Sequence, residues 1–285
     1  LEERTLSIVQ GSYENARHNR RLLERRTQSG RSSKRDNIKM AADIASRVPR
    51  VNDAQATFDS AMRTLKIIIG VEETVPVTLT DAFPAHYRTF KRGDLDESLR
   101  ENEPTLQALR TQIEADEYTI KLKRANFLPR LSAFASWNYS GIGDTYEVRG
   151  ENLDHYAVAG LKVSIPIWAG GERVAQLKQA KIDKANDMLR LNKTTKELGL
   201  ELRNAVSEYH AYIDTLEANK EAVELARRSF AMTRDLFASG QVSLADVNDA
   251  ELLLTNEKLS MALTLYNLNT TIANIERLTG TKLRR

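Results

Sequence analysis

The sequence has no cysteine, little glycine and proline, and no long apolar run. The missing cysteines exclude a disulfide framework and a thiolate metal site. With 13 Gly and 6 Pro in 285 residues, the chain has few breaks, which favours long uninterrupted elements. No stretch of 18 apolar residues occurs, which excludes a spanning helix but not a spanning β-strand. A net charge of only +3 gives little reason to expect a nucleic-acid partner.

Two short segments that lie 210 residues apart share one pattern of turn and helix-start residues. The aligned positions are Ser29, Gly30, Ser33 and Asp36 in the first segment and Ser239, Gly240, Ser243 and Asp246 in the second. In each, a glycine interrupts helical sequence, and a serine followed three residues later by an aspartate resembles a capping box. The pattern predicts a helical hairpin around each glycine. The turns are called the first tip (residues 29–36) and the second tip (residues 239–246).

Apolar residues recur every seven positions around both tips. Before the second tip they are Leu202, Tyr209, Leu216, Val223, Phe230 and Phe237; after it they are Val247, Leu254, Met261, Leu268 and Ile275. After the first tip the equivalent positions are Ile44, Val51, Phe58 and Leu65. A sustained seven-residue spacing predicts antiparallel coiled coils with left-handed supercoiling. The helix expected over 171–238 would be about 100 Å long. Pro49 is expected to kink the first return helix or to break its hydrogen-bond ladder locally.

The pattern predicts a mainly α fold with one β-hairpin and two structural repeats offset by 210 residues. The expected segments are a first-repeat helical hairpin over 1–70, a connector over 71–102, a helix over 103–128, a β-hairpin over 129–168 and a long second-repeat hairpin over 169–285.

The β-hairpin is expected from residues that alternate between apolar and polar. The apolar positions are Leu131, Ala133, Ala135, Trp137 and Tyr139 in one strand, and Leu161, Val163, Ile165 and Ile167 in the other. Such text fits a half-buried soluble hairpin slightly better than a membrane strand. However, an isolated hairpin is marginal in water. It therefore calls for strands from other copies of the chain, or from a part of it not present here.

The sequence resembles the TolC-like family of outer-membrane efflux and secretion channels. The carrying stretches are "LPRLSAFASWNYSG", "VSIPIWAGGERVAQLKQAK", "FASGQVSLADVNDAELLL" and "IERLTG". The resemblance implies a homotrimer whose strands join one β-barrel in outer-membrane lipid and whose helices form a long periplasmic α-barrel. It also implies an exit duct of a Gram-negative efflux or type I secretion machine, with a periplasmic adapter and an inner-membrane transporter as partners.

The resemblance also implies roles for particular residues. Asp246, Asp249 and Asp36 match pore-gate positions. Ser29, Gly30, Ser33, Ser239, Gly240 and Ser243 match adapter-docking tips, and the nine apolar strand residues given above match membrane-facing positions. Two features depart from the family. Val242 occupies the position at which well-known members carry a basic residue that pairs with the first-tip aspartate. Only one β-hairpin is present where the family has two per protomer, so upstream strands are expected to precede Leu1.

Other readings of these residues remain open. Asp36 and Asp246 fit helix capping better than a gate on sequence alone, whereas Asp249 has no acidic counterpart, because Lys39 occupies the matching position. The basic run 17–26 favours a solvated helix face over a nucleic-acid site. No catalytic, metal or cofactor site is expected. The rival function is a soluble periplasmic coiled-coil adapter or scaffold.

Overall fold

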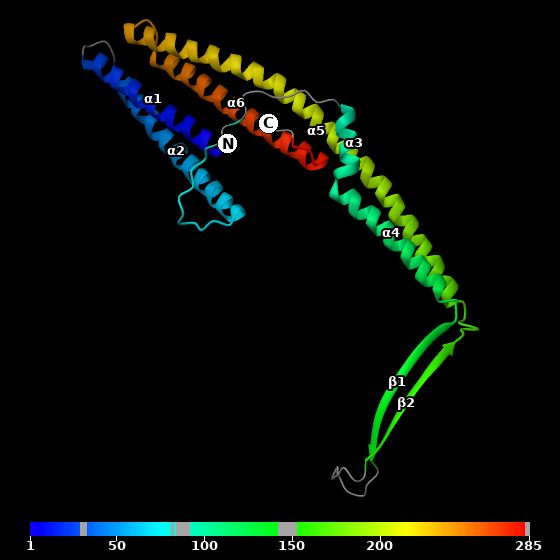
Figure 1. Cartoon of the computed structure of the whole chain (residues 1–285). Helices are drawn as coiled ribbons and strands as arrows, with labels where there is room; N and C mark the ends of the chain where they lie inside the picture. Colours follow the sequence, from blue (N-terminus) through cyan, green and yellow to red (C-terminus); the bar gives the residue numbers. More distant parts are fainter. Residues whose placement is uncertain (29–32, 81–82, 84–91, 142–152, 283–285) are drawn as a thin grey trace. The chain divides into compact units, whose positions relative to one another are not determined.

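The computed structural model describes residues 1–28, 33–80, 83, 92–141 and 153–282 (Figure 1). It divides into two compact units, Leu1–Asp96 with Leu200–Arg285, and Glu97–Gly199. The long helix α5 contributes residues to both units. The five segments expected from the sequence have boundaries that differ from those of the two units, and this division remains a prediction.

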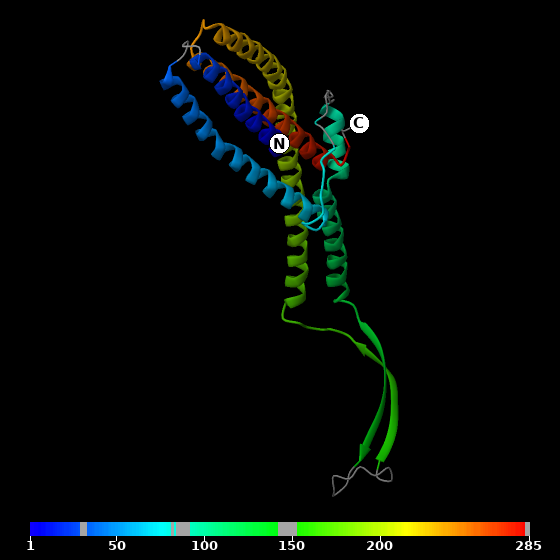
Figure 2. The same cartoon turned by 90° about the vertical axis from the view of Figure 1, so that its left-hand side faces the viewer.

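The first unit contains two helical hairpins. Helix α1 (Glu2–Gln28) lies beside α2 (Lys34–Ile69), and α6 (Leu244–Thr279) follows the last part of α5 (Glu172–Ser239). Figures 1 and 2 both show α1 next to α2, and α6 between α1 and α5. Helices α2 and α6 each have 36 residues, and both end at a glycine in the left-handed conformation, Gly70 and Gly280. The repeat therefore extends from the helix starts to the helix ends.

The second hairpin buries its predicted seam more fully than the first. All six predicted seam residues of α5 are buried, as are Val247, Leu254, Leu268 and Ile275 of α6. The matching positions of α2, from Ile44 to Leu65, are only half-buried. Pro49 lies inside α2 and does not end it. The loss of a single helical hydrogen bond at proline is evidently tolerated in this long helix.

The second unit joins α4 to the first part of α5. Helix α4 (Pro104–Ala125) is capped by Glu103, whose carboxylate accepts a hydrogen bond from the N–H of Leu106 at 3.0 Å. Its side chains reach α5 through Glu117, which accepts from Lys184 at 2.6 Å, and through Lys123, which donates to Gln176 at 3.3 Å. Helix α3 (Arg92–Asn102) falls in the segment that the sequence predicted as a connector.

The second unit also holds an antiparallel β-hairpin of β1 (Arg130–Gly141) and β2 (Leu153–Ser164). Its register places Leu131 opposite Val163 and Trp137 opposite Ala157, so the predicted apolar positions share one face. Those described side chains are exposed, Leu161 to 74%. The prediction was wrong at one end: β2 stops at Ser164, so Ile165 and Ile167 follow the strand. Pro166 lies between them, and proline cannot donate a ladder hydrogen bond.

Candidate functional site

The second tip is a tight turn that only glycine makes without strain. Helix α5 ends at Ser239, and Gly240 adopts a φ of 89°. The N–H of Gly240 donates to the carbonyl of Phe237 at 3.0 Å, and the N–H of Gln241 donates to that of Leu236 at 2.9 Å. These bonds satisfy carbonyls at the end of α5 that would otherwise lack partners. The chain then reverses into α6.

A complete capping box starts α6. The N–H of Asp246 donates to Ser243 Oγ at 3.3 Å, while the N–H of Ser243 donates to Asp246 Oδ2 at 2.8 Å. The Ser243 hydroxyl also donates to that carboxylate at 2.6 Å. The Ser243 side-chain bond, followed by its backbone bond, lowers the pKa of Asp246 below its ordinary value. Asp246 thus caps the helix as an exposed, stabilised anion.

The first tip repeats this box on α2. The N–H of Asp36 donates to Ser33 Oγ at 3.2 Å, and the N–H of Ser33 donates to Asp36 Oδ2 at 3.4 Å. Ser29 and Gly30 lie outside the described residues. The capping predicted for Asp36 and Asp246 is therefore present in both repeats, and each acid also complements the positive end of its helix.

Asp249 has no part in the capping box. It is exposed, whereas its neighbours Val247 and Ala250 belong to the buried core. Within the described part of the chain, the Asp249 carboxylate has no hydrogen bond or ion pair. Asp246 and Asp249 are three residues apart on adjacent turns, so α6 presents two carboxylates away from its core.

An arginine of the first repeat contacts the end of α5 next to the second tip. The sequence did not predict this contact. Arg26 of α1 donates through Nη1 to the carbonyl of Phe237 at 2.5 Å, and its guanidinium lies 4.5 Å from the centre of the Phe237 ring. A cation at the C-terminal end of α5 also complements the helix dipole. In the sequence, Arg26 belongs to the basic run 17–26, which was predicted to be a solvated helix face. Val242, in the position where the family carries a basic residue, packs against the core.

The described residues hold neither a cluster of metal-ligating side chains nor a helix that could span a membrane. No group of His, Asp or Glu side chains there has an arrangement that would hold a metal ion. The helices of that part of the chain are not apolar enough over a sufficient length to cross a membrane.

Residues 95–281 match the family model described as outer membrane efflux protein, which is more than half of the chain. The chain belongs to this family. Among curated relatives it is 30% identical over 243 residues to the outer membrane protein TolC of Escherichia coli, covering 80% of this chain and 48% of TolC. It is 24% identical over 290 residues to the alkaline protease secretion protein AprF of Pseudomonas aeruginosa, covering 98% of this chain and 58% of AprF. The chain thus spans about half the length of these relatives.

Solved structures confirm the expected fold class. The outer-membrane channel OprN superposes with a TM-score of 0.80 at 19% identity, covering 99% of this chain and 63% of that one. The channel CusC gives a TM-score of 0.78 at 17% identity, with 99% and 65% covered. At these identities the likeness shows the fold. Family membership confirms the expected place in the outer membrane. The family is named for efflux and AprF for secretion, and neither name gives an enzymatic activity.

Proposed function

We propose that this chain is part of a trimeric channel-tunnel that serves as the exit duct of an efflux pump or type I secretion system. Relatives named for protease secretion and for efflux support this function. The exposed apolar face of the β1–β2 hairpin suits outer-membrane lipid, and strands from three copies would close its edges. In this proposal residues 129–168 enter the membrane, while 1–70 and 169–285 form the periplasmic hairpins, with 71–102 and 103–128 between them.

The observation that carries the proposal is the carboxylate pair on α6. Asp246 and Asp249 are exposed and directed away from the core. Three copies around one axis would bring six carboxylates together, which is called here the carboxylate ring. Such a ring concentrates cations and narrows a pore electrostatically. Asp36 would add to the same acidic end from the first tip.

The two tips are also proposed to dock a periplasmic adapter that connects the duct to an inner-membrane transporter. In this proposal Ser29, Gly30, Ser33, Ser239, Gly240 and Ser243 form the docking edge. At the second tip, the left-handed Gly240 has no side chain and the capping Ser243 has a short one. A partner could therefore approach the backbone closely.

The test uses the full-length protein from its native membrane, reconstituted in planar bilayers. Asp246→Ala combined with Asp249→Ala is expected to raise single-channel conductance and to weaken block by La³⁺ at least roughly tenfold, since the ring focuses cations. Asp235→Ala is the matched control, because Asp235 is exposed on α5 close to the second tip but outside the proposed ring. Unchanged conductance in the double variant, or an equal change in the control, would refute the ring.

A further inference from the structure

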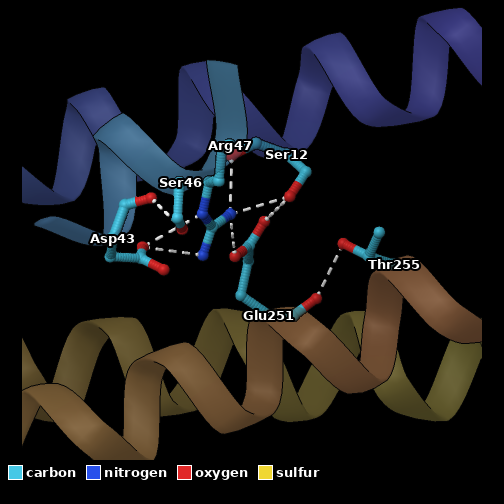
Figure 3. Close-up of polar contacts among 6 residues, drawn as sticks. All are labelled: Ser12, Asp43, Ser46, Arg47, Glu251 and Thr255. Carbon is cyan, nitrogen blue, oxygen red and sulfur yellow. Dashed lines mark hydrogen bonds and ion pairs between the residues drawn. The ribbon is translucent and has the colours of Figure 1, made fainter. Parts of the chain in front are cut away.

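A buried polar cluster joins three helices behind the proposed carboxylate ring. Arg47 of α2 donates through Nη1 to Glu251 Oε2 of α6 at 2.5 Å and to Ser12 Oγ of α1 at 2.7 Å. The Ser12 hydroxyl donates to the other oxygen of Glu251 at 2.6 Å. Asp43 accepts from the Nε and Nη2 atoms of Arg47, each at 3.0 Å. Figure 3 shows the guanidinium between the first hairpin and α6. The ion pair is called here the Arg47–Glu251 bridge.

The bridge is partly buried, and the ion pairs of the described residues that do not involve Arg47 are more exposed. The side chain of Glu251 is 2% exposed and that of Arg47 is 13% exposed. In contrast, the Arg277–Glu201 pair between α6 and α5 has side chains 57% and 43% exposed. Burial by itself lowers the pKa of Arg47, but the carboxylates of Glu251 and Asp43 outweigh it and raise the pKa. Arg47 therefore carries its charge, and removal of either partner would leave the other group unpaired in a poorly solvated place.

The residues of the bridge are not repeated at the equivalent positions of the other repeat. At the offset of 210 the positions equivalent to Ser12, Asp43, Arg47 and Glu251 carry Ala222, Leu253, Glu257 and Ala41. The coiled-coil hairpin itself is thus built without such a cluster. The charges occur where the first hairpin meets α6, so they serve the relation between hairpins and not the hairpin fold.

The position of Glu251 on α6 relates the bridge to the ring. Glu251 follows Asp249 by two residues, and successive residues of an α-helix are about 100° apart. The two carboxylates therefore point about 200° apart, Glu251 toward the first hairpin and Asp249 away from it. Any rotation of α6 that moves Glu251 also moves Asp249.

We propose that Arg47 and Glu251 are positioning residues that fix the rotation and height of α6, and with it the carboxylate ring, against the first hairpin. This inference rests on the proposed function. Apolar contacts are non-directional and tolerate small rotations and slides of one helix on another. A guanidinium that donates to fixed carboxylate and hydroxyl oxygens holds one geometry, because its donors form a rigid planar fork.

Replacement of both charges by apolar residues separates positioning from stability. A buried ion pair exchanged for well-packed apolar residues commonly leaves stability unchanged or higher, whereas removal of one partner destabilises strongly. Arg47→Met with Glu251→Leu is therefore expected to assemble with an unfolding temperature close to that of the wild type. Its α6 would nevertheless lose the directional contact. Glu251→Gln alone is expected to lower the recovery of assembled protein.

The experiment uses the full-length protein with two readouts, La³⁺ block in bilayers and the distance between spin labels at Ile38 and Leu252, both exposed. In the double variant we expect a broader label distance and block weakened by roughly tenfold, the scale of electrostatic focusing. Glu201→Gln, which breaks the exposed Arg277–Glu201 pair, should change neither readout.

The two readouts keep the proposals distinguishable. A double variant with wild-type label distance and wild-type block overturns the positioning role and leaves the bridge as packing alone. If the Asp246 and Asp249 variant itself leaves block unchanged, the ring fails. The label distance then decides by itself whether the bridge fixes α6, with a wild-type distance counting against it.

Discussion

The two return helices, α2 and α6, begin alike and then diverge within two turns. Ser33 with Asp36 and Ser243 with Asp246 form the same capping box. Beyond the cap, the position of Asp249 in α6 corresponds to Lys39 in α2. Among described residues, α6 buries fourteen side chains and α2 only Met40. The capping residues that start the two helices are thus repeated. The buried side chains and the charges differ further along, where α2 and α6 have different neighbours.

The largest effect is expected when one seam side chain in each return helix is truncated to alanine. Ile275 is fully buried, and Leu65, its counterpart at the offset of 210, is half-buried. Ile275→Ala is expected to cost roughly 2–5 kcal/mol, the range for truncation of a buried aliphatic side chain. Leu65→Ala should cost less than half as much, because part of its surface already contacts solvent. The measurement is the unfolding temperature of the full-length protein in detergent.

Leu122→Ala is a suitable control for this pair, since Leu122 is 63% exposed. It should leave the unfolding temperature nearly unchanged. Equal losses from Ile275→Ala and Leu65→Ala would show that the two return helices are packed equally in the assembled protein.

A smaller effect is expected from Arg26, by which the first repeat contacts the second tip. Arg26→Ala removes the hydrogen bond to the Phe237 carbonyl and the contact with the Phe237 ring. A hydrogen bond from a charged group contributes about 1.5–3 kcal/mol. Hydrogen exchange of the amides of Gly240 and Gln241 should therefore accelerate by at least about tenfold. Arg25→Ala, at the exposed neighbouring position, should leave exchange unchanged; equal acceleration would show that the net charge of α1 is responsible.

What the sequence predicted well depends on residues near one another along the chain. The seven-residue spacing located the buried seam of α5, and Ser243 with Asp246 located the start of α6. Both signals are local, because a helical period and a capping box need only one helix. The end of β2 was misplaced by four residues, 168 instead of 164, because Ile165 and Ile167 continue the alternation across Pro166.

What the sequence could not predict depends on contacts between distant residues. Arg26 and Phe237 are 211 positions apart, and Arg47 and Glu251 are 204 apart. No spacing rule connects them, and a single sequence offers no covariation. Asp43 and Arg47 are four residues apart and form an i, i+4 pair, which alone suggests an ordinary exposed helix face. That face contacts Glu251 only because α6 packs against it in the folded chain.

The smallest expected effect separates the two capping boxes by pH. Ser243 holds the pKa of Asp246 below its ordinary value in the folded protein. The stabilisation is therefore complete above the unfolded pKa and is lost as the pH falls through the folded one. Ser243→Ala removes the side-chain bond, so Asp246 should take up its proton at a higher pH than in the wild type. Loss of La³⁺ block on acidification should therefore shift to higher pH.

Ser33→Ala is the matched variant for this last test. It removes the same cap from α2 and weakens that helix start by the same kind of bond. It leaves Ser243 and Asp246 untouched and affects only Asp36, so the pH at which block is lost should move less than in Ser243→Ala. If both serine variants shift the profile equally, the acidic change reports helix capping in general. If Ser243→Ala shifts it more, the repeated cap at the second tip also tunes the charge that the proposed ring uses, and the two helix starts differ in role although both carry the same capping box.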